Sequence, residues 1–143
     1  MPLINAKGAE IADLAGLSLY PLAELPAALP APAGVVLTPD AELAGILPRL
    51  GELAVIAVEF PKFRDGRGFT IARALREHHG YKGDLRATGH FIPDQFAFLI
   101  SCGFTSFATP PEHAPAQFAA ELAKPRQPGQ LLRRSLGRAL EQG

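Results

Sequence analysis

The residues best suited to chemistry in this sequence lie in a short basic loop that holds Lys62, Arg64 and Arg67. Guanidinium groups are fork-shaped donors that match the oxygens of a carboxylate, a phosphate or a sulfur oxyanion. Gly66 and Gly68 belong to the same loop, and glycine lets a backbone approach a ligand closely. A helix predicted to begin near Gly68 would add the partial positive charge of its free amides. The sequence therefore predicts an anion-binding loop.

The glycines of this loop match no nucleotide-binding motif. Ile71 occupies the place of the third glycine of a dinucleotide fingerprint, and the sequence has no Gly-Lys-Ser/Thr of a P-loop. A simpler interpretation is that Asp65-Gly66 forms a turn and that the arginines pair with acidic neighbours. Both interpretations stay open at this point.

A further cation, Arg86, interrupts the short apolar segment 85–88. If this segment is a strand of a parallel sheet covered on both faces, the charge needs an acidic partner. Glu59, near the end of the preceding predicted strand, is the nearest candidate if the two strands are neighbours. We therefore predict a Glu59–Arg86 ion pair at the carboxyl edge of the sheet. We also expect Arg86 to join Lys62 and Arg67 in one positively charged pocket.

Three titratable side chains are candidates for proton transfer near the same edge, although the catalytic residues stay unknown. Asp65 belongs to the basic loop, His90 follows the third predicted strand, and Asp94 stands at the start of the next helix. His90 is more simply a surface residue, and Asp94 is equally suited to completing the first turn of its helix.

Motifs for a metal, a cofactor or a nucleophile are not recognisable in the sequence. Cys102 ends an apolar run in which a buried thiol is the default, and there is no Gly-x-Ser-x-Gly. No histidine has the partners that a metal site needs. We predict neither a metal nor a cofactor.

The elements that would position these residues alternate between strand and helix. Apolar runs predict strands over 35–37, 53–60, 85–88 and 105–108, and helical spacing predicts helices over 42–50, 68–79, 93–102 and 115–123. Because strands joined through helices cannot form hairpins, the connections must be right-handed crossovers between parallel strands. The sequence therefore predicts an α/β protein of four consecutive β/α units, either half of a TIM-like barrel or a flavodoxin-like sheet, with function at the carboxyl ends of the strands.

The segments that flank these units differ in character. Residues 3–11 predict a small β ribbon around Lys7-Gly8, and the Pro-rich residues 21–34 predict a connection. Residues 125–143 predict a linker and an amphipathic helix. We expect one α/β domain over residues 1–124, with residues 1–33 as its ribbon and lead-in.

The composition is that of a soluble globular protein. The 143 residues are 48% hydrophobic and 20% charged, which suffices for one core. The 14 basic and 14 acidic side chains balance, so nucleic-acid binding is not expected, and no apolar stretch approaches the ~20 residues of a membrane span. A single cysteine and the lack of a basic leader favour the cytoplasm. The basic surplus is local, because residues 62–86 hold seven basic and three acidic side chains.

The stretch FPKFRDGRGFTIARALREHHGYKGDLRATG, followed by DQFAFLISCGFTSF, resembles the bacterial domain-of-unknown-function family 934. The resemblance covers residues 52–108 and rests on Phe-Pro-Lys-Phe-x-Asp-Gly-Arg-Gly, followed by Gly-Tyr-x-Gly, Leu-Arg-Ala-x-Gly and Asp-Gln. It places motif positions at Arg73 and Gln95 as well as in the basic loop. The candidate anion- or ligand-binding residues are therefore Lys62, Arg64, Gly66, Arg67, Gly68, Arg73, Arg86 and Gln95.

The resemblance implies a link to sulfur metabolism. Members of the family are commonly described as probable oxidoreductases or as accessory proteins of sulfite reduction, because their genes lie beside that of the sulfite reductase haemoprotein. We expect a non-enzymatic accessory protein of assimilatory sulfite reduction with a basic anion-binding edge and the haemoprotein as partner. The alternatives are a small enzyme acting on an oxyanion or phosphorylated substrate, and a half barrel completed by self-association as a homodimer.

Overall fold

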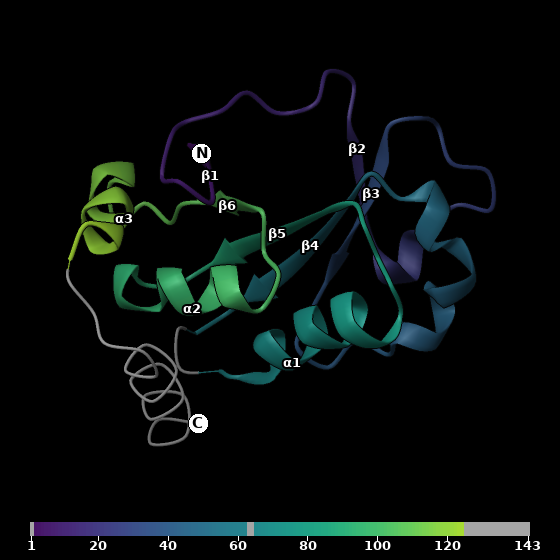
Figure 1. Ribbon diagram of the computed structural model, residues 1–143. Helices are drawn as coiled ribbons and strands as arrows, with labels where there is room; N and C mark the ends of the chain where they lie inside the picture. The colour runs from purple at the N-terminus through teal and green to yellow at the C-terminus, as the bar shows by residue number, and fades with distance from the viewer. Residues whose placement is uncertain (1, 63–64, 125–143) are drawn as a thin grey trace.

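A six-stranded sheet forms the centre of the protein (Figure 1). The structure is a computed structural model that describes residues 2–62 and 65–124. The strands are β1 (Leu3–Asn5), β2 (Ser18–Pro21), β3 (Ala33–Leu37), β4 (Val55–Phe60), β5 (Asp84–Gly89) and β6 (Ser106–Ala108). Strands β2 to β6 are parallel, and β1 runs antiparallel to β6. The predicted α/β class with a largely parallel sheet is therefore confirmed.

The strand order, which the sequence left open, is β1-β6-β5-β4-β3-β2. From β2 to β6 each strand lies beside the next one in the chain, without a reversal. Right-handed crossovers between such neighbours place the connecting segments on one face of the sheet. Figure 1 shows α1 (Arg67–Arg73) and α2 (Phe96–Ser101) beneath the sheet, and α3 (Pro115–Leu122) packs against α2.

Three of the predicted helices are present in the described part of the chain, each shorter than expected. Helix α1 continues as a π-helical turn (Ala74–His78), and α2 is preceded by a 3₁₀ turn (Pro93–Gln95). The helix predicted over 42–50 is wrong, because two 3₁₀ helices, Leu43–Gly45 and Leu47–Glu52, stand there. Pro48 has no amide hydrogen for an α-helix, and Gly45 disfavours one.

The N-terminal residues form the predicted ribbon and then a strand that the sequence analysis missed. Ile4 bridges Glu10, and the Gly8 amide donates to the Asn5 carbonyl at 3.0 Å. Strand β2 was missed because it ends at Pro21, the first residue of the Pro-rich segment. This segment then forms a short 3₁₀ helix (Leu22–Glu24) and reaches β3 at Ala33. Residues 6–17 connect β1 to β2 and pass over the face of the sheet opposite to α1 and α2 (Figure 1). We call this segment the N-terminal strap.

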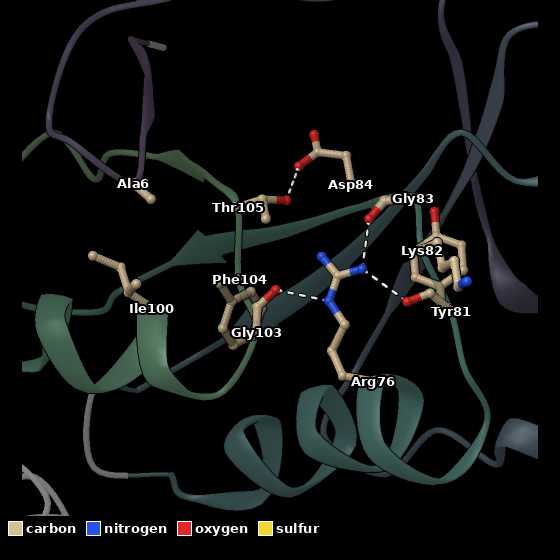
Figure 2. Close-up of a pocket in the computed structure, with 10 residues that line it drawn as sticks. All are labelled: Ala6, Arg76, Tyr81, Lys82, Gly83, Asp84, Ile100, Gly103, Phe104 and Thr105. Atoms are coloured by element: carbon tan, nitrogen blue, oxygen red, sulfur yellow. Dashed lines mark hydrogen bonds between the residues drawn. The ribbon is translucent and has the colours of Figure 1, made fainter.

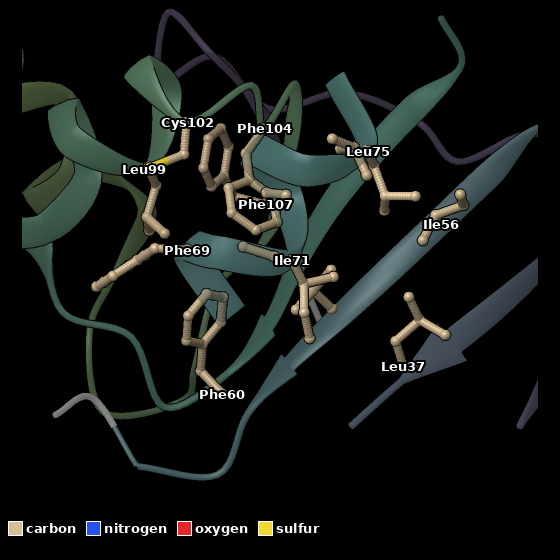
Figure 3. Packing of buried hydrophobic residues seen from close by; sticks show 14 of the residues in the cluster. Leu37, Ile56, Phe60, Phe69, Ile71, Leu75, Leu99, Cys102, Phe104 and Phe107 are labelled. Atoms are coloured by element: carbon tan, nitrogen blue, oxygen red, sulfur yellow. The ribbon is translucent and has the colours of Figure 1, made fainter. Parts of the chain in front are cut away.

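Phenylalanines fill the space between the sheet and its helices (Figure 3). The rings of Phe96 and Phe107 lie 4.8 Å apart between centroids, and those of Phe69 and Phe98 lie 4.9 Å apart, both near perpendicular. Edge-to-face contacts of this kind add about 0.5–1.5 kcal/mol per pair beyond the area that the rings bury. The packed core holds α1 and α2 against the sheet. It therefore also positions the residues at the carboxyl and amino ends of the strands.

On the opposite face of the sheet, small apolar side chains lie beside one buried charged side chain. Val55 and Ala57 are fully buried there, and Arg86 is 5% exposed. Three large apolar side chains are exposed to solvent on this side of the sheet: Ile11 and Leu14 in the strap, and Leu19 in β2. Self-association through this face stays a prediction.

Candidate functional site

The loop after β4 reaches the carboxyl edge of the sheet, as predicted, and leads into α1. Lys62 is exposed at this edge, and α1 begins at Arg67. Gly68 lets α1 approach β4, because a Cβ at this position would lie 2.5 Å from the Phe60 ring. The glycine therefore serves helix packing. The candidate Arg64 lies outside the described residues.

Asp65 and Arg67 form a two-pronged ion pair. Arg67 Nε donates to Asp65 Oδ1 at 3.0 Å, and Nη2 donates to Oδ2 at 2.8 Å. The Arg67 amide also donates to Asp65 Oδ1 at 3.1 Å. One amide at the start of the helix therefore binds Asp65 and is not available to an external anion. The Arg67 guanidinium holds the pKa of Asp65 below its usual range. Asp65 is therefore a carboxylate at neutral pH and a poor candidate for donating a proton.

Arg86 does not belong to this edge. It lies opposite Ala57 within the sheet, and its side chain is on the face crossed by the strap. Its Nη2 and Nη1 donate to the two carboxylate oxygens of Asp13, in the strap, at 2.8 and 3.1 Å, and Nη2 lies 3.5 Å from Asp84. The predicted pair with Glu59 is wrong, because Asp13 and Asp84 supply the charge instead. The expected pocket shared by Arg86, Lys62 and Arg67 is not formed, because Arg67 lies on a helix that covers the other face.

His90 and Glu112 form a side-chain contact at the carboxyl edge. His90 Nδ1 lies 3.0 Å from Glu112 Oε1, and both side chains are about half exposed. The His90 amide donates to the Phe60 carbonyl at 2.7 Å. Gly89 makes this crossing possible, because its φ is +98° and a Cβ there would lie 2.3 Å from the same carbonyl oxygen. The end of β5 is thereby joined to the end of β4.

The remaining candidates have structural contacts. Gln95 is fully buried, and its Oε1 accepts a hydrogen bond from the Ile92 amide at 3.3 Å. Asp94 is part of the same 3₁₀ turn. The Arg73 guanidinium lies over the Phe98 ring at 5.7 Å, and a hydrogen bond to Cys102 raises the pKa of Arg73. Burial raises the pKa of the Cys102 thiol, which agrees with its prediction as an unreactive core residue.

A cavity that the sequence analysis did not anticipate lies at the opposite, amino-terminal edge of β5 and β6 (Figure 2). Its volume is about 740 Å³, and it opens to solvent. Arg76, Lys82, Asp84 and Thr105 supply its polar groups, and Ile100 and Phe104 supply apolar ones. The family motif includes Gly80-Tyr81 and Arg76, two of which line this cavity, but the sequence alone assigned no chemical role to these residues.

Neither a metal-binding cluster nor a membrane-spanning helix is found among the described residues. Within residues 2–62 and 65–124, no three His, Cys, Asp or Glu side chains come together in a way that could hold a metal ion. Among the helices that the structure describes, none has the length and apolar character needed to cross a membrane.

The fold and both edges define a small α/β protein with one mostly parallel sheet, an ion-paired carboxyl edge and a cavity at the amino edge. A family model described as "Bacterial protein of unknown function (DUF934)" matches residues 34–131, and the chain belongs to this family. The match runs from β3 past α3, so it includes Arg86 but not its partner Asp13. No curated protein and no solved structure is significantly similar to the chain.

Proposed function

We propose that this protein is a non-enzymatic accessory protein of assimilatory sulfite reduction that docks on the sulfite reductase haemoprotein through its carboxyl edge. The process and the partner come from the family resemblance. The mode of action comes from the chemistry of the edge, where Lys62, Arg67 and His90 gather.

The observation that carries the proposal is the exposure of the polar side chains at this edge. The side chains of Arg67, His90 and Glu112 are 62%, 56% and 51% exposed. Groups that stabilise a transition state work best where water is excluded, because water weakens their electrostatic interactions. Exposed charges contribute instead to the rate and the specificity of protein association. The edge is therefore better suited to docking than to catalysis.

Lys62 supplies the charge that the edge can offer to a partner. Arg67 is already paired with Asp65, and His90 with Glu112, whereas Lys62 has no ion pair within the part of the chain that the structure describes. A carboxylate or another anionic group of the partner would pair with the Lys62 ammonium and with the exposed side of Arg67. The proposed role requires no cofactor on this chain.

Binding of the full chain to purified sulfite reductase haemoprotein tests the proposal. We expect a complex by isothermal titration calorimetry at low salt, and we expect Lys62→Glu to weaken it by about tenfold or more, because one lost interfacial charge contact amounts to about 1.4 kcal/mol. Lys82→Glu is the matched control, since it makes the same charge change on an exposed lysine at the opposite edge.

Two results would contradict the proposal. One is the lack of any complex at low salt. The other is turnover of sulfite by the purified chain with a chemical reductant, which would support the alternative of an enzyme acting on an oxyanion.

A further inference from the structure

The face of the sheet under the strap, which we call the strap face, carries an apolar surface that no described residue covers. Ile11, Leu14 and Leu19 are 40%, 49% and 40% exposed, and they stand within nine residues of one another. Among the described residues, Leu122 is the one other large apolar side chain that is exposed. Grouped exposed apolar side chains of this kind mark an interaction surface.

An occupant of this surface would pack on the face and would not extend the sheet. At one edge, the ribbon already pairs with β1, because the Ile11 amide donates to the Leu3 carbonyl at 2.8 Å. At the other edge, β2 is only four residues long and ends at Pro21, which has no amide hydrogen to offer to a further strand.

The strap face is also acidic. Asp13 and Asp84 both lie beside the single guanidinium of Arg86, so this cluster keeps one negative charge, and Glu10 is exposed in the strap. Residues 1–61 as a whole hold two basic and seven acidic side chains. A complementary occupant is therefore both apolar and basic.

Residues 131–142 of this chain have that composition, and we call them the C-terminal segment. They lie outside the described residues, and their sequence predicts an amphipathic helix in which Leu132, Leu136 and Leu140 form one stripe. At 100° per residue, Arg133 lies about 60° from Leu136, at the border of this stripe. Residues 124–143 hold five basic side chains and one acidic one.

The described chain ends within reach of the strap. Helix α3 packs against the turn of the ribbon, since a Cβ at Gly8 would lie 2.8 Å from Ala119 Cα (Figure 1). Lys124 follows Ala119 by five residues, about 8 Å along a helix. The linker of residues 125–130 spans up to about 20 Å when extended, and Ile11 is only three residues beyond Gly8. The C-terminal segment can therefore reach the strap of its own molecule.

We propose that the C-terminal segment folds as a helix on the strap face of the same molecule, with its leucine stripe against Ile11 and Leu14 and with Arg133 beside Glu10. The stripe from Leu132 to Leu140 is about 12 Å long, which suffices to cover two side chains that stand three residues apart. The strap face and the proposed docking edge share no residue, so this contact is independent of the haemoprotein.

A nitroxide spin label on Gln142→Cys in the full chain tests the contact. The native Cys102 is 2% exposed, so the label attaches to the introduced cysteine. We expect the amide signals of Ala12 and Leu14 in the strap to lose intensity relative to the reduced label, and the Lys62 amide at the carboxyl edge to keep its intensity. No loss at the strap would overturn the proposal.

Two leucine variants of the labelled chain distinguish the stripe from the rest of the segment. We expect Leu136→Gln to abolish the loss of strap signal. Leu131→Gln is the matched control, because it makes the same change about 140° away around the helix, and it should leave the loss intact. Neither leucine belongs to the buried core that the structure describes. Equal effects of the two changes would overturn the proposal.

A mixing experiment distinguishes the same molecule from a second copy. Isotope-enriched chain without a label is combined with spin-labelled chain of natural isotopic abundance. We expect no loss of strap signal in the enriched chain. A loss there would show that the segment docks on another copy, which would overturn the intramolecular contact.

Discussion

Three arginines of the described part of the chain, Arg49, Arg67 and Arg86, spend their charge on ion pairs within the protein. The sequence allowed two interpretations of the basic loop, and the structure shows that Arg67 pairs with a near neighbour, Asp65. For Arg86 it correctly indicated that a partner was needed but named the wrong one. Asp13 lies 73 residues earlier in the chain, and neither spacing nor periodicity connects a strap residue with a distant strand.

The Asp13–Arg86 pair gives a prediction about stability. Asp13→Ala should destabilise the fold by about 2 kcal/mol, because Arg86 is 5% exposed and would keep only the more distant Asp84 as a charged partner. Urea unfolding measures the difference. Glu10→Ala, at an exposed strap position, is the control and should change stability by about 0.5 kcal/mol or less. Equal effects of the two changes would show that the pair contributes nothing.

The Asp65–Arg67 pair gives a prediction about pH. Arg67 holds the pKa of Asp65 below its ordinary value of 3.8, so the folded state binds this proton less readily than the unfolded state. The stabilisation from the pair is therefore complete above the ordinary pKa and is lost as the pH falls through the lowered one. A carbon-detected titration should show the carboxyl of Asp65 titrating below 3.8 in the native chain, with the midpoint rising in Arg67→Gln. An unchanged midpoint in that variant would contradict the role of Arg67.

At the scale of elements, helical periodicity predicted the α-helices that pack on the sheet but gave a wrong helix over 42–50, where 3₁₀ helices stand. The spacing over 68–79 and 93–102 predicted α1 and α2, because their apolar side chains must face the sheet. The change from α- to π-helix after Arg73 leaves no such pattern in the sequence. The position of Arg76 on this π turn, facing the carbonyls of the next segments, was therefore beyond sequence reasoning.

Arg76 Nε donates to the Gly103 carbonyl at 3.0 Å, and this contact gives a prediction about Gly103. This glycine has φ +110°, and an added Cβ would lie 2.4 Å from Arg76 Cγ. Gly103→Ala should therefore cost about 2 kcal/mol or more, through backbone strain and displacement of the arginine. Chemical denaturation measures this cost. Gly51→Ala is the control, because nothing lies within 4 Å of its added Cβ and its φ is not positive. A neutral Gly103→Ala would show that the arginine is not held as tightly as its contacts indicate.

At the scale of the whole molecule, the sequence predicted the α/β class but not the strand order. The connections between successive strands are similar in character, so nothing in them distinguishes neighbouring strands from separated ones. The observed order puts Lys62 and Arg67 at one end of the strands and Arg76 and Lys82 at the other. Four cations that lie close together in the sequence, Lys62, Arg67, Arg76 and Lys82, are therefore divided in space between two edges.

This division leads to a prediction for association with the haemoprotein. The chain has a net charge of zero, so electrostatic steering of a partner depends on locally separated charge, such as that at the carboxyl edge, and not on the molecule as a whole. Because salt at 1 M shortens the screening length to about 3 Å, the association rate constant should fall by about tenfold or more between low salt and that concentration. The dissociation rate constant should change much less, and surface plasmon resonance measures both. In Lys62→Glu the association rate should already be low in dilute buffer and should respond weakly to salt. An association rate that is independent of salt in the native chain would mean that the partner does not approach through this charged edge.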